Sequence, residues 1–149
     1  MKMPAPFFIF VIIFSALFTF PVFGLTPPYT PQMLQQEADL VIEGQVRGTI
    51  QCKGKSAENQ CYIRYNYQTE IQINKILKGN EKVEKTIPVV FYHNDYSLSK
   101  CVGDQGASLH EGDAGTFYLK KSDKGYYYPF HWSSVEIKTS GSKAWPKCK

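Results

Sequence analysis

The clearest feature of the sequence is a strict alternation of apolar and polar residues between Cys61 and Ile76. One parity carries Ile63, Tyr65, Tyr67, Thr69, Ile71 and Ile73, and the other carries Arg64, Asn66, Gln68, Glu70, Gln72 and Asn74. A period of two predicts a β-strand with one buried face and one solvated face. Because the run is longer than a typical strand, it predicts the long, coiled strand that a small barrel needs.

A second apolar segment follows at Lys82–Tyr92, after a turn at Lys78-Gly79-Asn80. The two segments predict a central hairpin over Tyr67–Tyr92, which we expect to be scaffold rather than functional surface. Its apolar residues should line the core. The four that test this interpretation are Ile71, Ile73, Ile87 and Val89.

The residues before this hairpin predict a short helix and a bent strand. Thr30 precedes Pro31, as expected for an N-cap followed by proline in the first helical turn, and predicts a helix over Pro31–Glu37. A strand is expected over Ala38–Gly48, where Gly44 interrupts the apolar face and indicates a bulge or sharp bend. Gln51–Gln60 is polar and is expected to be a loop.

The rest of the chain predicts two further strands and one long loop. His93–Asp113 is a polar stretch, which in a compact domain is either functional or pinned. Strands are expected over Gly115–Lys120 and Tyr126–Lys138, joined by a turn at 122–125. Five strand regions and one short helix predict an all-β fold, a small five-stranded barrel. The alternative, an immunoglobulin-like sandwich, requires about seven strands.

The N-terminus has the order of a secretory signal. One charge, Lys2, precedes the apolar run Phe7–Phe20, and Gly24 ends the segment at a position that a signal peptidase reads. We expect a signal peptide at 1–24 and a single mature domain at 25–149, with no stable membrane anchor after cleavage. An uncleaved anchor is the alternative, but the apolar run is shorter than the roughly 20 residues of a spanning helix. The predicted location is secreted or periplasmic.

Net charge does not indicate a nucleic-acid partner. Without Lys2 the chain has 16 basic and 13 acidic residues, a mild and dispersed excess. Acidic residues are interleaved with the basic ones of the hairpin, so nucleic acid is not expected. The basic residues considered for such a role are Arg64, Lys75, Lys78, Lys82 and Lys85.

All four cysteines, Cys52, Cys61, Cys101 and Cys148, lie after the signal peptide. An even number in an exported chain predicts disulfides, for which three pairings exist. Cys52 and Cys61 bracket the polar loop and are the expected local pair, which leaves Cys101 to bond Cys148. A four-cysteine zinc site is disfavoured because such sites use closely spaced pairs.

Three short stretches, in this order, carry a family resemblance: Ala38–Val46, Thr69–Gly79 and Leu109–Asp113 leading into 117–119. The layout resembles secreted oligonucleotide/oligosaccharide-binding (OB) barrels similar to the tissue inhibitors of metalloproteinases (TIMP) and the netrin-like module, as in exported bacterial proteins. The resemblance implies an OB-fold-like barrel over most of the mature chain. In the inhibitors the mature chain begins with a cysteine that chelates the enzyme's zinc. Here the expected first residue is Leu25, so no inhibitory residue is carried over.

Two candidate chemistries compete in the long polar stretch. His93, Asp95, His110 and Asp113 combine imidazole with carboxylate and, if folded together, could bind a divalent metal or serve acid–base catalysis. Their spacing matches no known metal motif, so solvated loop polarity is the preferred interpretation. No G-x-S-x-G motif, phosphate loop or dinucleotide fingerprint occurs. We therefore expect neither a cofactor nor a bound metal.

The aromatic cluster at 126–132 offers a surface of a different kind. If it is a strand, Tyr126, Tyr128, Phe130 and Trp132 share one face, expected to be core, while Tyr127 and His131 lie on the exposed face. We predict a non-enzymatic binding module whose partner is another protein or an envelope or extracellular ligand. The alternatives are a metal-binding protein or metal-dependent hydrolase, and a proteinase inhibitor without the N-terminal cysteine. The predicted binding surface comprises His93, Asp95, Tyr96, His110, Asp113, Tyr127 and His131.

Overall fold

The computed structural model describes residues 27–80, 82–141 and 146–148 of the 149-residue chain, and the predicted signal peptide lies outside these ranges. No helix in the described ranges is long and apolar enough to span a membrane. The elements are α1 (Pro31–Glu37), β1 (Leu40–Val46), β2 (Gln51–Glu58), β3 (Ile63–Lys78), β4 (Thr86–Asp95), β5 (Ala114–Lys121), β6 (Tyr127–Pro129) and β7 (Val135–Thr139).

Five of these strands close a barrel in the order β1-β3-β4-β6-β5, with β5 pairing back to β1. The pairing of β4 with β6 is parallel, through Val89 and Tyr127, and the other pairings are antiparallel. Strands β2 and β7 lie outside the ring, where β2 pairs with β3 and β7 pairs with β5. The predicted fold class, an all-β five-stranded OB-fold-like barrel with a short N-terminal helix, is confirmed.

Strand β3 is the longest element, at 16 residues, and its length lets it serve two neighbours on one edge. Its first part pairs with β2 and its last part pairs with β1. The bend predicted at Gly44 is present as a register shift between Glu43 and Gly44. A Cβ at Gly44 would lie 2.6 Å from the carbonyl oxygen of Gln72. Glycine is therefore required there because the two strands approach closely.

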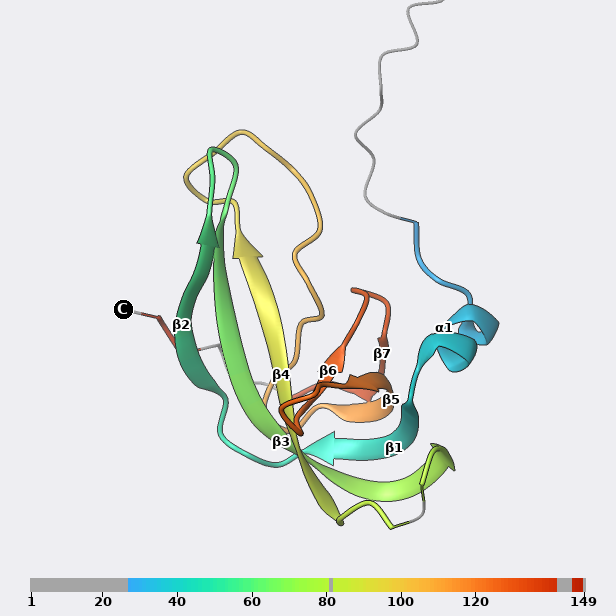
Figure 1. Ribbon diagram of the computed structural model, residues 1–149. Helices are drawn as coiled ribbons and strands as arrows, with labels where there is room; N and C mark the ends of the chain where they lie inside the picture. The colour runs from blue at the N-terminus through green and yellow to red at the C-terminus, as the bar shows by residue number, and fades with distance from the viewer. Residues whose placement is uncertain (1–26, 81, 142–145, 149) are drawn as a thin grey trace, which may run out of the picture.

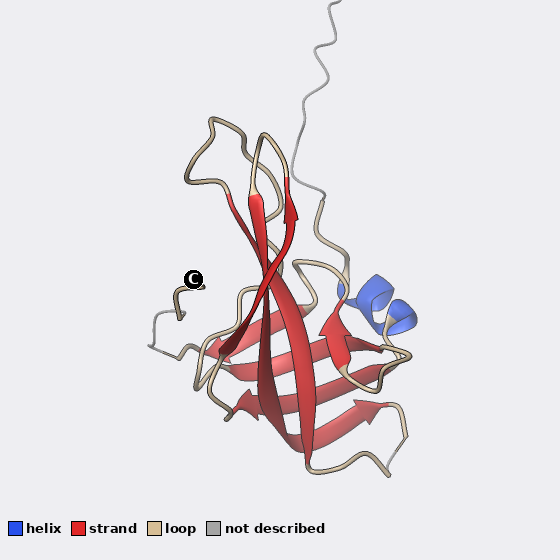
Figure 2. Cartoon of the chain, turned by 60° about the vertical axis from the view of Figure 1, so that its left-hand side comes forward, coloured by secondary structure: helices blue, strands red, loops and turns tan. Residues whose placement is uncertain are grey.

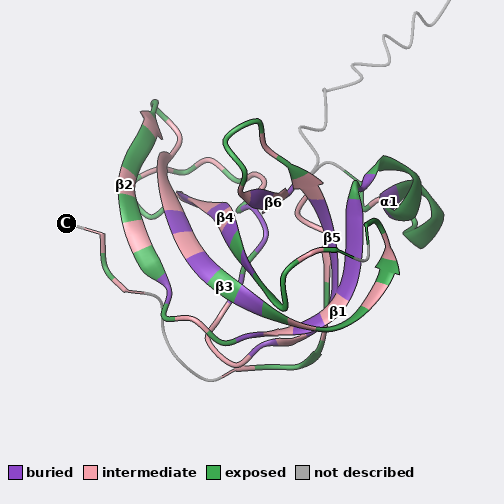
Figure 3. Ribbon diagram, turned by 60° about the horizontal axis from the view of Figure 1, so that its bottom comes forward, coloured by how far each residue is buried: buried purple, intermediate pink, exposed green. Residues whose placement is uncertain are grey.

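The barrel interior holds one apolar core, and Figure 3 shows buried residues along β1, β3, β4, β5 and β6. Three of the four residues that test the hairpin interpretation, Ile71, Ile87 and Val89, are at most 2% exposed. Ile73 is half-buried and packs against the same cluster. The predicted burial of the hairpin's apolar face is confirmed. The central members of the core are Ile42, Val46, Ile71, Val89, Leu109, Phe117 and Leu119.

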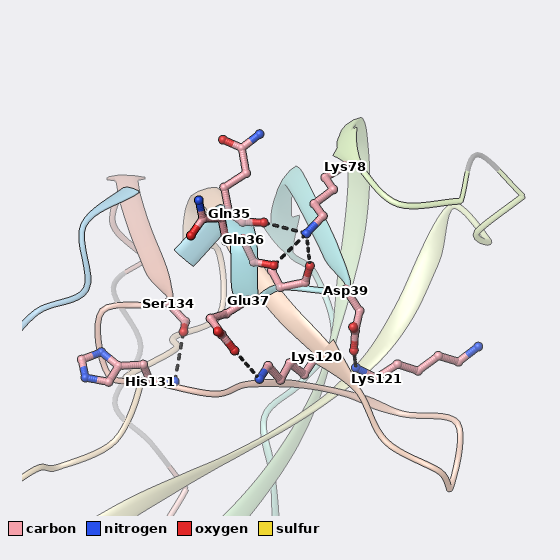
Figure 4. A network of polar contacts seen from close by, with 10 residues as sticks. Gln35, Gln36, Glu37, Asp39, Lys78, Lys120, Lys121, His131 and Ser134 are labelled. Atoms are coloured by element: carbon pink, nitrogen blue, oxygen red, sulfur yellow. Dashed lines mark hydrogen bonds and ion pairs between the residues drawn. The ribbon is translucent and has the colours of Figure 1, made fainter. Parts of the chain in front are cut away.

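Helix α1 covers the outside of the barrel wall through Leu34, which is buried with Val41 and Tyr118. Its N-cap is the predicted one, because the Thr30 hydroxyl accepts a hydrogen bond from the backbone of Met33. The C-terminal end is capped by Lys78, whose ammonium donates to carbonyl oxygens at the end of the helix (Figure 4). These acceptors are Gln35, Gln36 and Ala38.

Strand β2 and its neighbours rise beyond the barrel on one side, together with the loop that follows β4 (Figures 1 and 2). We call this part the extension: β2, residues 59–67, residues 91–95 and loop residues 96–106. The prediction of a loop over Gln51–Gln60 was wrong, because most of it is strand β2. Its sequence is polar and mostly exposed, and it is a strand only because it pairs with β3. An apolar pattern therefore could not indicate it.

The cysteine pairing was also predicted incorrectly. The disulfides join Cys52 to Cys148 and Cys61 to Cys101, with Cα–Cα distances of 5.5 and 5.3 Å. Because β2 is extended, its six steps from Cys52 to Glu58 cover roughly 20 Å. Cys52 and Cys61 therefore lie toward opposite ends of the hairpin, well beyond the few ångströms that a disulfide spans.

The last strand region is broken in two and its faces are opposite to the prediction. A turn in which Ser134 donates to the carbonyl of His131 separates β6 from β7. Tyr127 was expected on the exposed face, but it is 9% exposed and belongs to the core. Tyr128 and Phe130, expected in the core, are half-buried. The reason is the parallel pairing of β6 with β4, which turns Tyr127 toward the barrel interior.

Candidate functional site: the extension and its disulfides

The extension has two faces, and the first continues the barrel core outward. Strand β4 runs to Asp95, three residues past the predicted end, so His93 and Asp95 lie on a strand. Cross-strand pairs then place His93 opposite Tyr65, and Phe91 opposite Tyr67. The rings of Tyr67 and Phe91 stack with centroids 5.5 Å apart. Core packing is thereby carried into the extension.

Beyond this ring pair lies a hollow of about 360 Å³ between the strands and the C-terminal tail. The tail is held there by the disulfide between Cys52 and Cys148. The hollow combines aromatic, imidazole and carboxylate groups, which suits hydrogen bonding to a ligand or partner. It is lined by Tyr65, Tyr67, His93, Asp95, Pro146, Lys147 and Cys148.

Two of the titratable groups in this hollow, His93 and Asp95, have lowered pKa values. Burial lowers the pKa of His93, opposed by the nearby charge of Asp95. The pKa of Asp95 is lowered mainly by a hydrogen bond from the backbone of Ser97, at 2.8 Å, and then by the Ser97 side chain. At neutral pH the pair is thus a neutral imidazole beside a carboxylate, which offers acceptors to a partner's N–H or O–H groups.

The opposite face of the extension carries a polar network centred on Asp104. Arg64 lies over the ring of Tyr92, 4.2 Å from its centroid, and donates to the side chain of Asn94 at 2.8 Å. Asn94 in turn donates to the carbonyl of Asp104 at 2.6 Å. The hydroxyl of Tyr92 donates to the Asp104 carboxylate at 2.9 Å. These contacts hold the loop after β4 against the two long strands.

Three further observations show how tightly that loop packs. Burial, followed by the hydrogen bond to Asp104, raises the pKa of Tyr92 to about 12. Gly106 has φ of +84°, and a Cβ there would lie 2.2 Å from the carbonyl oxygen of Tyr92. Tyr96, one of the predicted surface residues, is half-buried and donates its hydroxyl to the carbonyl of Asp104. The loop is therefore packed against the end of β4.

The end of the extension is fixed by the second disulfide and by one serine. Cys101 bonds Cys61, and the Ser99 hydroxyl donates to the carbonyl of Cys61 at 2.5 Å while accepting from the backbone of Cys101. Yet Leu98, which precedes Ser99, and Val102, which follows Cys101, are 85% and 83% exposed. The other large apolar residues exposed in the described ranges, Met33 and Leu77, reach 45% and 42%.

His110 and Asp113 lie in a separate place, where they close a turn. The Asp113 carboxylate is 2% exposed and accepts from the backbone of His110 at 2.8 Å and of Gly141 at 2.6 Å. The His110 ring lies 3.5 Å from the same carboxylate. In the described ranges, no three His, Cys, Asp or Glu side chains are grouped closely enough to hold a metal ion. The four candidate ligands are thus not brought together.

His131 lies away from the extension's hollow, in the turn between β6 and β7. Its Nδ1 is 2.7 Å from the hydroxyl of Ser133, and its ring stacks on Tyr29 at 4.4 Å. Burial lowers the pKa of His131, opposed by the charge of Asp104. These contacts attach the segment before α1 to the barrel. These contacts give His131 a structural role.

Of the predicted site residues, the structure therefore brings His93 and Asp95 together in one hollow and leaves Tyr96 nearby in the loop. The residues that sequence reasoning missed are those that fix the loop, above all Asp104, Asn94 and Ser99. Sequence spacing gives no signal for them, because the contacts of Arg64 and Asn94 join residues 30 positions apart. The sequence does contain one signal for this region, namely the two aliphatic residues Leu98 and Val102 inside a polar stretch.

The fold is a small disulfide-bonded β-barrel with a lateral extension that is tied to it by two disulfides. No protein-family model matches the sequence, and no significant match is found among curated proteins or solved structures. The two disulfides are compatible with an oxidising extracellular environment.

Proposed function

We propose that this protein is a secreted or periplasmic, non-enzymatic binding module that recognises its partner through the extension. One observation carries the proposal. A loop of eleven residues, 96–106, is fixed by a disulfide and by the network around Asp104. Yet Gly106 is the only one of these eleven residues that is buried. Because the loop contributes almost nothing to the core, core packing does not explain why it is fixed, and a role in function does.

Rigidity of this kind favours recognition. A surface that is already ordered does not lose loop entropy when it binds, so more of the contact energy appears as affinity. The hollow beside His93 and Asp95 supplies hydrogen-bond acceptors on one face, and the end of the loop supplies apolar groups. This combination of a polar margin and apolar contacts is the usual composition of a protein-binding surface.

The exposed edge of β2 is poorly suited to pairing with a strand of a partner. This favours the loop and the hollow as the binding surface. The pairing of β2 with β3 shifts register twice, and Gly54 has φ of +103°. Lys53 and Lys55 are exposed along the strand. Bulges and lysines are the features that keep an edge strand from pairing with another chain.

The proposal is tested by capture from the envelope fraction and growth medium of the producing organism. The bait is residues 25–149 with both disulfides confirmed, and enrichment is quantified by mass spectrometry. Gln60→Arg with Lys100→Glu changes two exposed positions of the extension, and Asp123→Arg with Lys124→Glu changes two exposed positions of the β5–β6 turn.

We expect the extension variant to lose at least about fivefold of the captured partner, and the turn variant to retain it. Equal capture by both variants, or loss only with the turn variant, would place the contact on the barrel and contradict the proposal.

A further inference from the structure

The end of the extension carries two exposed aliphatic side chains, Leu98 and Val102, and a hollow. Beside the exposed Leu98 lies a hollow of about 180 Å³, formed jointly by the β2–β3 turn and the loop. The two segments that form it are held together by the disulfide between Cys61 and Cys101. Six of its lining residues are Glu58, Asn59, Gln60, Tyr62, Leu98 and Ser99.

Three further contacts give this surface a fixed form. The Asn59 side chain accepts from the backbone of Cys61 and of Tyr62, which shapes the turn. The rings of Tyr62 and Tyr96 lie 5.5 Å apart and join the turn to the loop. These contacts fix the turn against the loop that carries Leu98, which lines the hollow.

We infer that this end, residues 58–63 and 96–102, is the docking site for a folded protein partner, with Leu98 and Val102 as its apolar anchors. The inference deepens the proposed function, on which it rests, by naming the contact residues and the kind of partner. A complementary partner presents an apolar pocket for Leu98 and Val102 and a small side chain that enters the 180 Å³ hollow.

The surroundings of the two anchors favour a protein over a lipid bilayer. Around them the surface is polar, with Gln60, Ser97 and Ser99 close by in sequence or across the hollow, and such a polar rim surrounds the apolar centre of protein interfaces. Glu58 is paired with Lys55, and Asp95 balances Lys100 in the same region. The end thus has no basic excess to attract anionic lipid.

The size of the apolar surface gives a second reason. An amphipathic helix attaches to a membrane through a long apolar face, and even one acyl chain binds only marginally. Two aliphatic side chains are much smaller than either. They are sufficient as anchors in a protein pocket, where a few buried residues dominate the affinity.

The test replaces single residues with a photo-crosslinking phenylalanine analogue in the full chain, expressed in the producing organism. Positions 98 and 102 are the probes, and position 77 is the control because Leu77 is also exposed but lies at the far end of β3. We expect one protein to be crosslinked from positions 98 and 102 and not from 77. Equal crosslinking from all three positions would overturn the inference.

A second arm separates this inference from the broader proposal. The double variant Leu98→Ser with Val102→Ser is compared with Leu77→Ser in capture of the same protein, and both are tested for flotation with vesicles of neutral and of anionic phospholipid. We expect at least tenfold weaker capture by the double variant and no flotation of any form. Flotation that depends on Leu98 and Val102 would overturn the inference.

Unchanged capture by the double variant, together with loss in Gln60→Arg with Lys100→Glu, would also reject the two anchors while leaving the extension as the contact region. Unchanged capture by both would reject the proposed function itself. Folding of each variant is confirmed from its thermal transition, which should not move because the replaced side chains are exposed.

Discussion

The barrel and the extension are parts of one sheet, but different forces hold them. In the barrel, side chains such as Ile42, Phe117 and Leu119 are fully buried and exclude water from the core. In the extension, only the stacked pair Tyr67 and Phe91 belongs to the core, residues 62–66 are half-buried, and order beyond the ring pair comes from two disulfides and from hydrogen bonds around Asp104. The comparison shows that a small protein can hold an exposed surface rigid without adding to its apolar core.

The largest expected effect is a core truncation in the barrel. Phe117→Ala removes a side chain that is 0% exposed, and should lower the free energy of unfolding by about 3–5 kcal/mol through lost burial and the cavity left behind. Leu98→Ala, in the extension, should change it by less than about 0.5 kcal/mol. Chemical denaturation of both variants measures this. A similar loss for the two would remove the contrast between the regions.

The next largest effect concerns the disulfide at the end of the extension. Replacing Cys61 and Cys101 by serine opens a covalent link between positions 40 apart in sequence, and should lower the free energy of unfolding by about 2–4 kcal/mol. Thermal unfolding under non-reducing conditions checks the value. Mass mapping of the oxidised protein must first show Cys61 bonded to Cys101, and a Cys52–Cys61 peptide would contradict the structure.

A smaller effect is expected from the polar network. Tyr92→Phe removes the hydroxyl that donates to Asp104 and should cost about 1 kcal/mol. The wild-type protein should also show one tyrosine that ionises only near pH 12, because burial and the Asp104 carboxylate both disfavour the phenolate. Ultraviolet titration should show that this late step is missing from Tyr92→Phe. A late step that survives the substitution belongs to another tyrosine.

The smallest effect concerns the cap on helix α1, which lies on the barrel side. Lys78→Met keeps the aliphatic stem but removes the ammonium that donates to the last carbonyl groups of the helix. Such a contact at a helix C-terminus contributes about 0.3–1 kcal/mol. Chemical denaturation should show a loss in this range, with amide exchange faster in α1 and unchanged in the extension. Faster exchange in both would mean that the two regions are coupled.

The same contrast explains how much the sequence could predict. Strands β3 and β4 carry apolar residues at a period of two, and β1 carries an isolated glycine, Gly44, inside its apolar pattern, so the fold class and the bend were both predicted. Helix α1 was found because its N-cap is local, with Thr30 and Met33 three residues apart.

The extension could not be predicted in this way. Strand β2 is polar and exists because β3 offers it backbone partners, and the true cysteine pairs depend on that hairpin. Asp113 and His110 were expected to be solvated loop residues, with metal ligation as the alternative, but Asp113 is buried and accepts from the backbone of His110 and of the distant Gly141. Tyr127 was assigned to the wrong face because its orientation follows from the parallel pairing with β4. Each error concerns a contact between residues far apart in sequence.

The most direct test of the account is residue-resolved amide exchange on the protein lacking the Cys61–Cys101 disulfide. The central claim is that the extension is held by this bond and its polar network, independently of the barrel core. We predict faster exchange at the amides of Asn94, Ser99 and Cys101, while amides in β1 and β5 keep their protection. Equal loss of protection in β1, β5 and the loop would contradict the claim, because the two regions would then unfold as one unit.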